Sequence, residues 1–279
     1  MRKSISARSC PNSQETVCGF CYLAFQLLLL PELLTMLNDQ LSAPLREAEL
    51  NFIFYTINFI AVLLIFHDFL AGAANQAVRH PAYLCQAVIL GLAAYYACML
   101  VTNRVIGLLV PGFSNYNDSA IATMGQDSRL LVFIGTVLLV PTVEECVFRG
   151  LIFRNLYGKS HWCAYIVSML AFALIHILGY VRQYTPLEIL MAVLQYLPAG
   201  LCLAWSYTKA DTIFAPIAIH ATVNFITLTS WRGFYAQNST IIPPCGQPDC
   251  CRRGGGAARQ RCQGAAGKRR GRGGFQGHH

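Results

Sequence analysis

The chain has 279 residues, of which 55% are hydrophobic and only 12% are charged, and its mean hydropathy is +0.45. A typical soluble domain has about 25% charged residues, so this composition excludes an ordinary soluble protein and favours the lipid bilayer as solvent. The net charge of +8 is concentrated, because residues 249–279 hold eight of the 21 Lys and Arg residues and only one acidic residue. The rest of the chain is nearly neutral, and its charge gives no reason to expect specific nucleic-acid binding.

Several apolar runs are long enough to cross a bilayer, which requires about 20 residues. They fall near residues 17–37, 50–72, 82–112, 129–157, 163–184, 187–208 and 211–231. We therefore predict an all-α fold, a polytopic transmembrane helical bundle with about seven spans and a range of roughly six to eight. Pro141 in the fourth run has no N–H and is expected to kink its helix and free backbone groups there.

The predicted domain organisation is a transmembrane bundle over residues 1–245, followed by a tail over residues 246–279. The tail is rich in Gly and Arg and lacks an apolar period, so it is predicted to be disordered and basic. Basic residues at the N-terminus alternate with acidic loops further on, which predicts a multi-pass protein with a cytoplasmic N-terminus. Seven spans would then place the basic tail outside, against the positive-inside rule. Either one span is miscounted, or the tail is an exception to the rule.

The fourth run contains the sequence VPTVEECVFRG, in which two carboxylates and an arginine lie inside an apolar stretch. An ionisable residue in a membrane span is by default a functional-site hypothesis. Glu145 and Arg149 are four residues apart, so they share a helix face and are expected to pair. Glu144 points about 100° away from Glu145. It has no such partner in its own helix and is expected to face a cavity as a base.

Two later runs also carry polar residues near their middles, as Phe172 with His176 and as His220 with Asn224. The positions of Glu144, His176 and His220 along their runs place them at similar depth, so packed helices are expected to bring them to one buried site. A Glu with two His can bind Zn²⁺ or activate a water molecule. An Asn can donate to a developing oxyanion. This set suits peptide hydrolysis in a water-accessible pocket.

Simpler interpretations exist for each group taken alone. A lone His in an apolar helix is more often satisfied by a neighbouring carbonyl, and a Glu–Arg pair four residues apart is commonly structural. A transporter or proton relay also uses buried Glu and His, but it predicts internal repeats or broken-helix pairs. Pro141 and Pro198 are present, yet no convincing repeat accompanies them.

Three motifs, EExxxR, FxxxH and HxxxN, occur in this order on successive apolar runs across roughly residues 129–231. In this order and spacing they resemble the CPBP family, which includes the CAAX prenyl endopeptidases and the bacteriocin-processing or bacteriocin-immunity membrane proteins also called Abi proteins. The sequence EECVFRGLIFRNLYGK looks like that of bacterial members of the family. The resemblance therefore implies an integral protein of a bacterial cell membrane.

The resemblance also implies roles for individual residues. Glu144 resembles the glutamate that activates the attacking water, and His176 resembles its partner in holding that water or a metal. His220 and Asn224 resemble the residues that stabilise the oxyanion. The supporting residues are Glu145, Arg149 and Phe172. The candidate metal ligands are Glu144, His176 and His220 if Zn²⁺ is bound, and a metal-independent glutamate mechanism is the other option. No HExxH sequence is present.

The function implied is an intramembrane, CAAX-type endopeptidase that hydrolyses peptide bonds near the membrane. Its substrate would be the C-terminal tripeptide of a prenylated CAAX protein or a bacteriocin-type precursor. Its partners would be that membrane-associated peptide or prenylated protein and the lipid bilayer. The alternative is a non-catalytic membrane protein of the same fold that confers bacteriocin self-immunity or acts as a scaffold.

Overall fold

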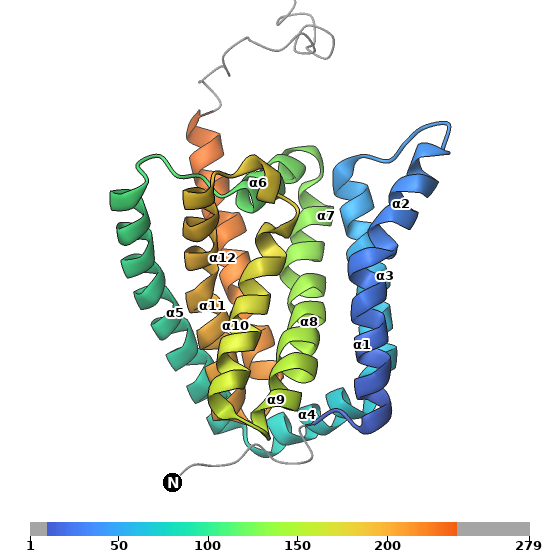
Figure 1. Cartoon of the computed structure of the whole chain (residues 1–279), viewed down its shortest axis with the longest axis vertical. Coiled ribbons are helices and arrows are strands. Elements are labelled where there is room, and N and C mark those ends of the chain that lie inside the picture. The colour runs from blue at the N-terminus through green and yellow to red at the C-terminus, as the bar shows by residue number, and fades with distance from the viewer. Residues whose placement is uncertain (1–9, 239–279) are drawn as a thin grey trace, which may run out of the picture. The chain divides into compact units, whose positions relative to one another are not determined.

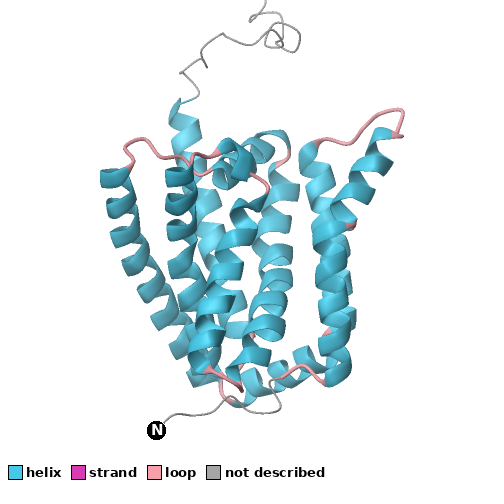
Figure 2. Ribbon diagram, viewed as in Figure 1, coloured by secondary structure: helices cyan, strands magenta, loops and turns pink. Residues whose placement is uncertain are grey.

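The computed structural model describes residues 10–238, with side chains as far as Ser230. Every regular element in this part of the chain is helical, which confirms the predicted all-α class (Figure 2). The predicted tail, residues 246–279, lies outside the described residues. The α-helices are α1 (Ser13–Leu28), α2 (Leu30–Asp39), α3 (Glu47–Ile65), α4 (His67–Arg79), α5 (Pro81–Leu109), α6 (Tyr116–Asp127), α7 (Arg129–Ile134), α8 (Val140–Glu145), α9 (Arg154–Tyr157), α10 (His161–Leu178), α11 (Pro186–Ala210) and α12 (Phe214–Asn238).

Membrane spans can be assigned to most of the predicted apolar runs. In the described part of the chain, five helices are long and apolar enough to cross a bilayer, and the pair α1 and α2, bent by 41°, would make a sixth. The predicted run 50–72 is divided, because α3 ends at Ile65 and α4 begins at His67. The predicted seventh span coincides with α12, whose described apolar part, Phe214–Ser230, is shorter than the others. The six candidates lie within the predicted range of six to eight, and α12 would be the seventh.

The outward faces of these helices carry large apolar side chains. Leu64, Leu108 and Trp162 are 75%, 82% and 77% exposed, which in water would form an unfavourable surface. The inside holds the opposite kind of residue, because Glu145 and Arg149 are fully buried. Apolar residues outside and a charged pair inside are the arrangement expected of an integral membrane protein.

The fourth span, Arg129–Tyr157, runs as one helix of 29 residues through Pro141. Two π-helical segments, Gly135–Leu139 and Cys146–Phe153, interrupt its α-helical parts. In the first segment the N–H of Val140 bonds to the carbonyl of Gly135, one residue further back than in an α-helix. Pro141, which has no N–H to donate, follows directly. The structure thus has a change of helical register at the position where a kink was predicted.

Close packing of α10 on α11 sets the framework around the site. These helices lie side by side in the middle of the bundle, and α11 also packs against α5 (Figure 1). A Cβ atom added to Gly200 on α11 would lie only 2.9 Å from Cα of Met169 on α10. Only a glycine permits that approach of one helix to the backbone of the other.

A tight turn after α11 positions the last helix. Asp211 has a left-handed backbone with φ of 54°, and it ends α11. The hydroxyl of Thr212 donates to the carbonyl of Ala73 on α4 at 2.8 Å, which anchors the turn. α12 begins at Phe214, so His220 and Asn224 lie in its second and third turns, where both line the pocket inside the bundle.

Candidate active site

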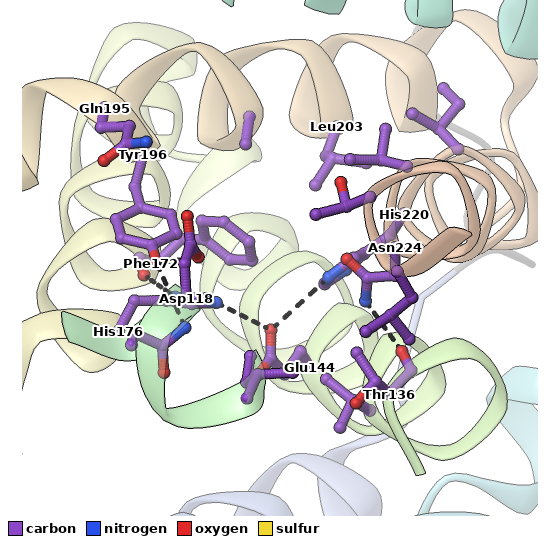
Figure 3. A pocket seen from close by; sticks show the side chains of 18 of the residues that line it. Asp118, Thr136, Glu144, Phe172, His176, Gln195, Tyr196, Leu203, His220 and Asn224 are labelled. Atoms are coloured by element: carbon purple, nitrogen blue, oxygen red, sulfur yellow. Dashed lines mark hydrogen bonds and ion pairs between the residues drawn. The ribbon is translucent and has the colours of Figure 1, made fainter. Parts of the chain in front are cut away.

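A pocket of about 210 Å³ inside the bundle is lined by residues of α3, α5, α6, α8, α10, α11 and α12. The four predicted catalytic residues, Glu144, His176, His220 and Asn224, all line it (Figure 3). Phe172 lines it as well, whereas Glu145 and Arg149 lie behind its wall. Residues from three separate apolar runs therefore meet in one place, as their similar depth predicted.

Glu144 lies at the centre of this group. Its Oε2 atom is 3.6 Å from Nε2 of His176 and 4.0 Å from Nε2 of His220. These distances exceed those of direct hydrogen bonds, and Oε2 has no hydrogen-bond partner among the described residues. The three side chains are only 12%, 14% and 8% exposed. One carboxylate oxygen and two imidazole nitrogens thus face a common, largely enclosed space.

Glu145 and Arg149 form the predicted ion pair, with Nη1 of Arg149 donating to Oε1 of Glu145 at 3.1 Å. The same Oε1 also lies 2.9 Å from Nδ1 of His220, a contact that the helix-face argument did not predict. Since a carboxylate only accepts, Nδ1 of His220 carries the proton. In the neutral ring, Nε2 is then the acceptor that faces Glu144. Glu145 therefore orients His220 in addition to neutralising Arg149.

Arg149 has further contacts that hold it in place. Its Nη2 donates to the carbonyl of Gly200 at 3.1 Å, and its guanidinium lies 4.5 Å from the ring centroid of Phe172. A buried charge requires such compensation, and an aromatic face supplies part of it through a cation–π contact. The arginine thus connects the helix that carries Glu144 to both α10 and α11.

His176 is oriented in a similar way by its own helix. Its Nδ1 lies 2.7 Å from the carbonyl of Phe172, so Nδ1 donates and Nε2 faces Glu144 as an acceptor. One face of the imidazole stacks on the ring of Tyr196, with centroids 4.4 Å apart. The ring of Phe172 lies 4.6 Å from the ring of His176 and 5.8 Å from that of His220. Phe172 therefore packs against both histidines.

Asn224 lies one turn beyond His220 on α12. Its side-chain amide Nδ2 donates to the carbonyl of Thr136 at 2.8 Å. Thr136 belongs to the first π-helical segment, whose irregular backbone exposes this acceptor. The amide has a second hydrogen that remains available in the pocket.

The sequence interpretation missed a polar wall made by Asp118 and Tyr196. The hydroxyl of Tyr196 donates to Oδ1 of Asp118 at 3.4 Å, and both residues line the pocket. Burial raises the pKa of Asp118, while the charge of His176 and the hydrogen bond from Tyr196 act in the opposite direction. Asp118 lies in what reads as a loop between spans. Only tertiary folding brings α6 to the pocket, and no local sequence signal marks it.

The donor atoms of the candidate metal set, Glu144, His176 and His220, are of the types that bind Zn²⁺. Both imidazoles also present an unprotonated Nε2, as a ligand must. If an ion were bound, these three side chains would hold it, and it would polarise the attacking water. Within the described residues, no group of three or more His, Cys, Asp or Glu side chains is placed to hold a metal ion. The carboxylate of Glu144 can also activate a water without a metal.

The fold and site together define a polytopic helical membrane protein with a glutamate–histidine site inside its bundle. Residues 126–226, which carry all three motifs, match the family model described as "Type II CAAX prenyl endopeptidase Rce1-like". This match confirms the predicted resemblance to the CAAX endopeptidases over that segment.

Two curated relatives are similar over a comparable length. The chain is 27% identical over 134 residues to "Putative membrane peptidase YdiL" of Bacillus subtilis, covering 46% of this chain and 50% of that protein. It is also 27% identical over 115 residues to "UPF0177 protein YbdI" of Lactococcus lactis, covering 41% of this chain and 54% of that protein. The chain thus spans about half the length of the curated relatives it matches. No solved structure matches it.

Proposed function

We propose that this protein is an intramembrane endopeptidase that hydrolyses peptide bonds near the membrane by a glutamate-activated water. The observation that carries this proposal is the position of Oε2 of Glu144, which faces Nε2 of His176 and Nε2 of His220 at 3.6 and 4.0 Å without a direct hydrogen bond. A water molecule fits between three such acceptors, because it can donate to two of them at ordinary hydrogen-bond lengths.

The reaction begins when Glu144 accepts a proton from this water and the water oxygen attacks the scissile carbonyl carbon. The enclosed position of Glu144 favours this step, since few other waters compete for the carboxylate. His176 is oriented by the Phe172 carbonyl at 2.7 Å. Its Nε2 accepts a hydrogen bond from the second hydrogen of the water, which points a lone pair of the water oxygen at the substrate.

The carbonyl oxygen becomes an oxyanion as the new C–O bond forms. His220 takes up a second proton from solvent before the attack, so its Nε2 donates to this oxygen while Glu145 accepts from Nδ1 at 2.9 Å. The free amide hydrogen of Asn224 is the second donor. The C–N bond then breaks as Glu144 returns its proton to the leaving amine, and the new carboxylic acid loses its own proton to that amine, which leaves a carboxylate and an ammonium group as products.

The substrate is proposed to be a membrane-associated peptide or protein segment, with a prenylated CAAX peptide and a bacteriocin-type precursor as the two classes to test. The family match over residues 126–226 supports the first class. The bacterial relatives support a place in a bacterial cell membrane. The rival function, self-immunity or scaffolding without catalysis, requires no water in the pocket.

Purified full-length protein in liposomes, incubated with each peptide class in ¹⁸O-labelled water, tests the proposed reaction. We expect mass spectrometry to detect a cleaved product with ¹⁸O in its new C-terminal carboxylate. If neither class is cleaved, and the Glu144→Gln variant still protects cells against a bacteriocin as well as the wild type does, the self-immunity function replaces the proposed one.

A further inference from the structure

Asp118 is a carboxylate in the pocket wall that the proposed reaction does not use. It lies in the first turn of α6, a helix that begins where the side chain of Asn115 accepts hydrogen bonds from the N–H groups of Asn117 and Asp118. The backbone N–H of Tyr116 donates to the hydroxyl of Tyr184 at 2.8 Å, which ties the start of the helix to the segment before α11. The carboxylate is thus presented to the pocket from a fixed position.

The contacts of Asp118 leave most of its hydrogen-bonding capacity unused. Oδ1 accepts one long bond of 3.4 Å from Tyr196, whose hydroxyl also accepts from Nδ2 of Asn117 at 3.1 Å. No Lys or Arg pairs with Asp118 among the residues that the structure describes. A carboxylate near a helix N-terminus is stabilised by the helix dipole, but that role does not require the side chain to line a cavity.

The pocket as a whole has an unbalanced charge. Its lining includes two carboxylates, Glu144 and Asp118, the two histidines beside Glu144, and no Lys or Arg within the described part of the chain. The nearest arginine, Arg149, is buried behind the wall and bonded to Glu145 and Gly200. Because the fixed charges of the lining are negative and only the two histidines can carry a positive charge, the cavity favours cationic ligands over anionic ones.

Burial makes the unpaired carboxylate costly, as the raised pKa of Asp118 reflects. A cationic group placed beside it would remove that cost, since charge-assisted hydrogen bonds are the strongest in such surroundings. An acidic side chain or a free C-terminal carboxylate would add a third negative charge to the pocket instead. The pocket wall therefore attracts cationic groups of a ligand and repels anionic ones.

We infer that Asp118 binds a cationic group of the peptide substrate, a Lys or Arg side chain or a free amino terminus, and thereby determines the specificity of the pocket. This inference rests on the proposed peptidase function, because it names the substrate class of that same site. A substrate segment that ends in a free C-terminal carboxylate is excluded from the Asp118 end of the pocket, so that end of the substrate lies on another side.

A charge scan of a cleaved peptide tests this assignment in the full-length protein in liposomes. Each of the residues flanking the cleaved bond is replaced in turn by Lys, Gln or Glu, and one further pair of peptides differs only in N-terminal acetylation. At one position, or at the amino terminus, we expect the wild type to favour the cationic peptide over the anionic or acetylated one by about tenfold in kcat/KM. That is the effect of one charge-assisted hydrogen bond.

Variants then assign the preference to Asp118. In Asp118→Asn the ratio should fall to within about threefold of unity, and in Asp118→Lys the Glu peptide should become the better substrate. The matched control is Asp127→Asn, which removes the same charge from an exposed position on the same helix and should keep the wild-type ratio. An unchanged ratio in Asp118→Asn, or no charge preference in the wild type, would overturn the inference.

Binding of labelled peptides to the Glu144→Gln variant separates this inference from the proposed function. If the wild type cleaves nothing but Glu144→Gln binds Lys peptides more tightly than Glu peptides, and loses that preference with Asp118→Asn added, the specificity assignment stands and the hydrolytic function fails. If cleavage occurs but neither assay shows a charge preference, the function stands and the assignment fails.

Discussion

Nδ1 of His220 lies 2.9 Å from Oε1 of Glu145, the same oxygen that accepts the hydrogen bond from Arg149. The second carboxylate of the EExxxR motif thus connects a buried cation to a histidine of the pocket. Neutralising Arg149 explains why Glu145 can be buried, and orienting His220 gives it a role in the site. The two roles can be separated by mutation.

Glu145→Ala should reduce both stability and activity. It leaves the fully buried Arg149 without its counter-charge, which costs about 3–5 kcal/mol of unfolding free energy, and it removes the anchor of His220. Adding Arg149→Met should recover most of the stability, because the unpaired charge is gone. Peptide cleavage should remain about 10²-fold or more below wild type in the double variant. Thermal unfolding in detergent and cleavage rates measure the two effects. Recovery of both would show that Glu145 acts only as a counter-ion.

Tyr196 is expected to fix the ring of His176 by stacking at a centroid distance of 4.4 Å. Tyr196→Leu removes the stacked ring and should lower kcat by up to about tenfold, the worth of an aromatic pair. Tyr196→Phe keeps the ring and should retain most of the rate. Single-turnover cleavage at saturating peptide makes the comparison. Equal rates for the Leu and Phe variants would contradict a positioning role for the ring.

Gly200 is expected to be required for the packing of α10 on α11. In Gly200→Ala the new Cβ would lie 2.9 Å from Cα and 3.1 Å from the carbonyl oxygen of Met169, which cannot move as a side chain can. Overpacking of this kind costs about 1–3 kcal/mol of unfolding free energy. Gly107→Ala on α5 is the control, since a Cβ there meets nothing within 4 Å. A Gly200→Ala protein as stable as this control would contradict the packing described.

Whether cleavage requires bound Zn²⁺ can be tested by removing the metal. Because the proposed mechanism activates the water with the carboxylate of Glu144 alone, we expect cleavage to survive dialysis against a strong zinc chelator. Elemental analysis of the purified protein should then find no stoichiometric zinc. Loss of wild-type activity on chelation, its restoration by added Zn²⁺, and the absence of bound zinc from a His176→Ala variant would together assign a metal to Glu144, His176 and His220.

The helical class and the meeting of the site residues were both predictable from the sequence. Apolar runs mark membrane helices strongly, because the bilayer imposes both their length and their composition. The similar depth of three polar residues in their runs then predicted that they meet in one place. The pocket lining confirms this for Glu144, His176 and His220. Residues inside an apolar run stand out in this way because burying an ionisable group is so costly.

Features that depend on tertiary geometry were not predicted. The contact of Glu145 with His220 joins residues 75 apart in sequence, and no local pattern indicates it. Asp118 belongs to a polar segment where an acidic residue is unremarkable, and only the folding of α6 brings it to the pocket. The expected kink at Pro141 appeared as a π-helical register change, because the missing N–H can be accommodated by shifting the bonding pattern of the preceding turn.

Activation of the hydrolytic water by Glu144 is tested by the cleavage rate of Glu144→Gln in liposomes. The substitution keeps the size of the side chain and removes the base. The control is Glu32→Gln on α2, which changes an exposed glutamate in the same way. We predict that Glu144→Gln is inserted and folded but cleaves at least about 10³-fold more slowly than wild type, while Glu32→Gln retains the wild-type rate. A Glu144→Gln protein that cleaves at the wild-type rate would contradict the proposed mechanism.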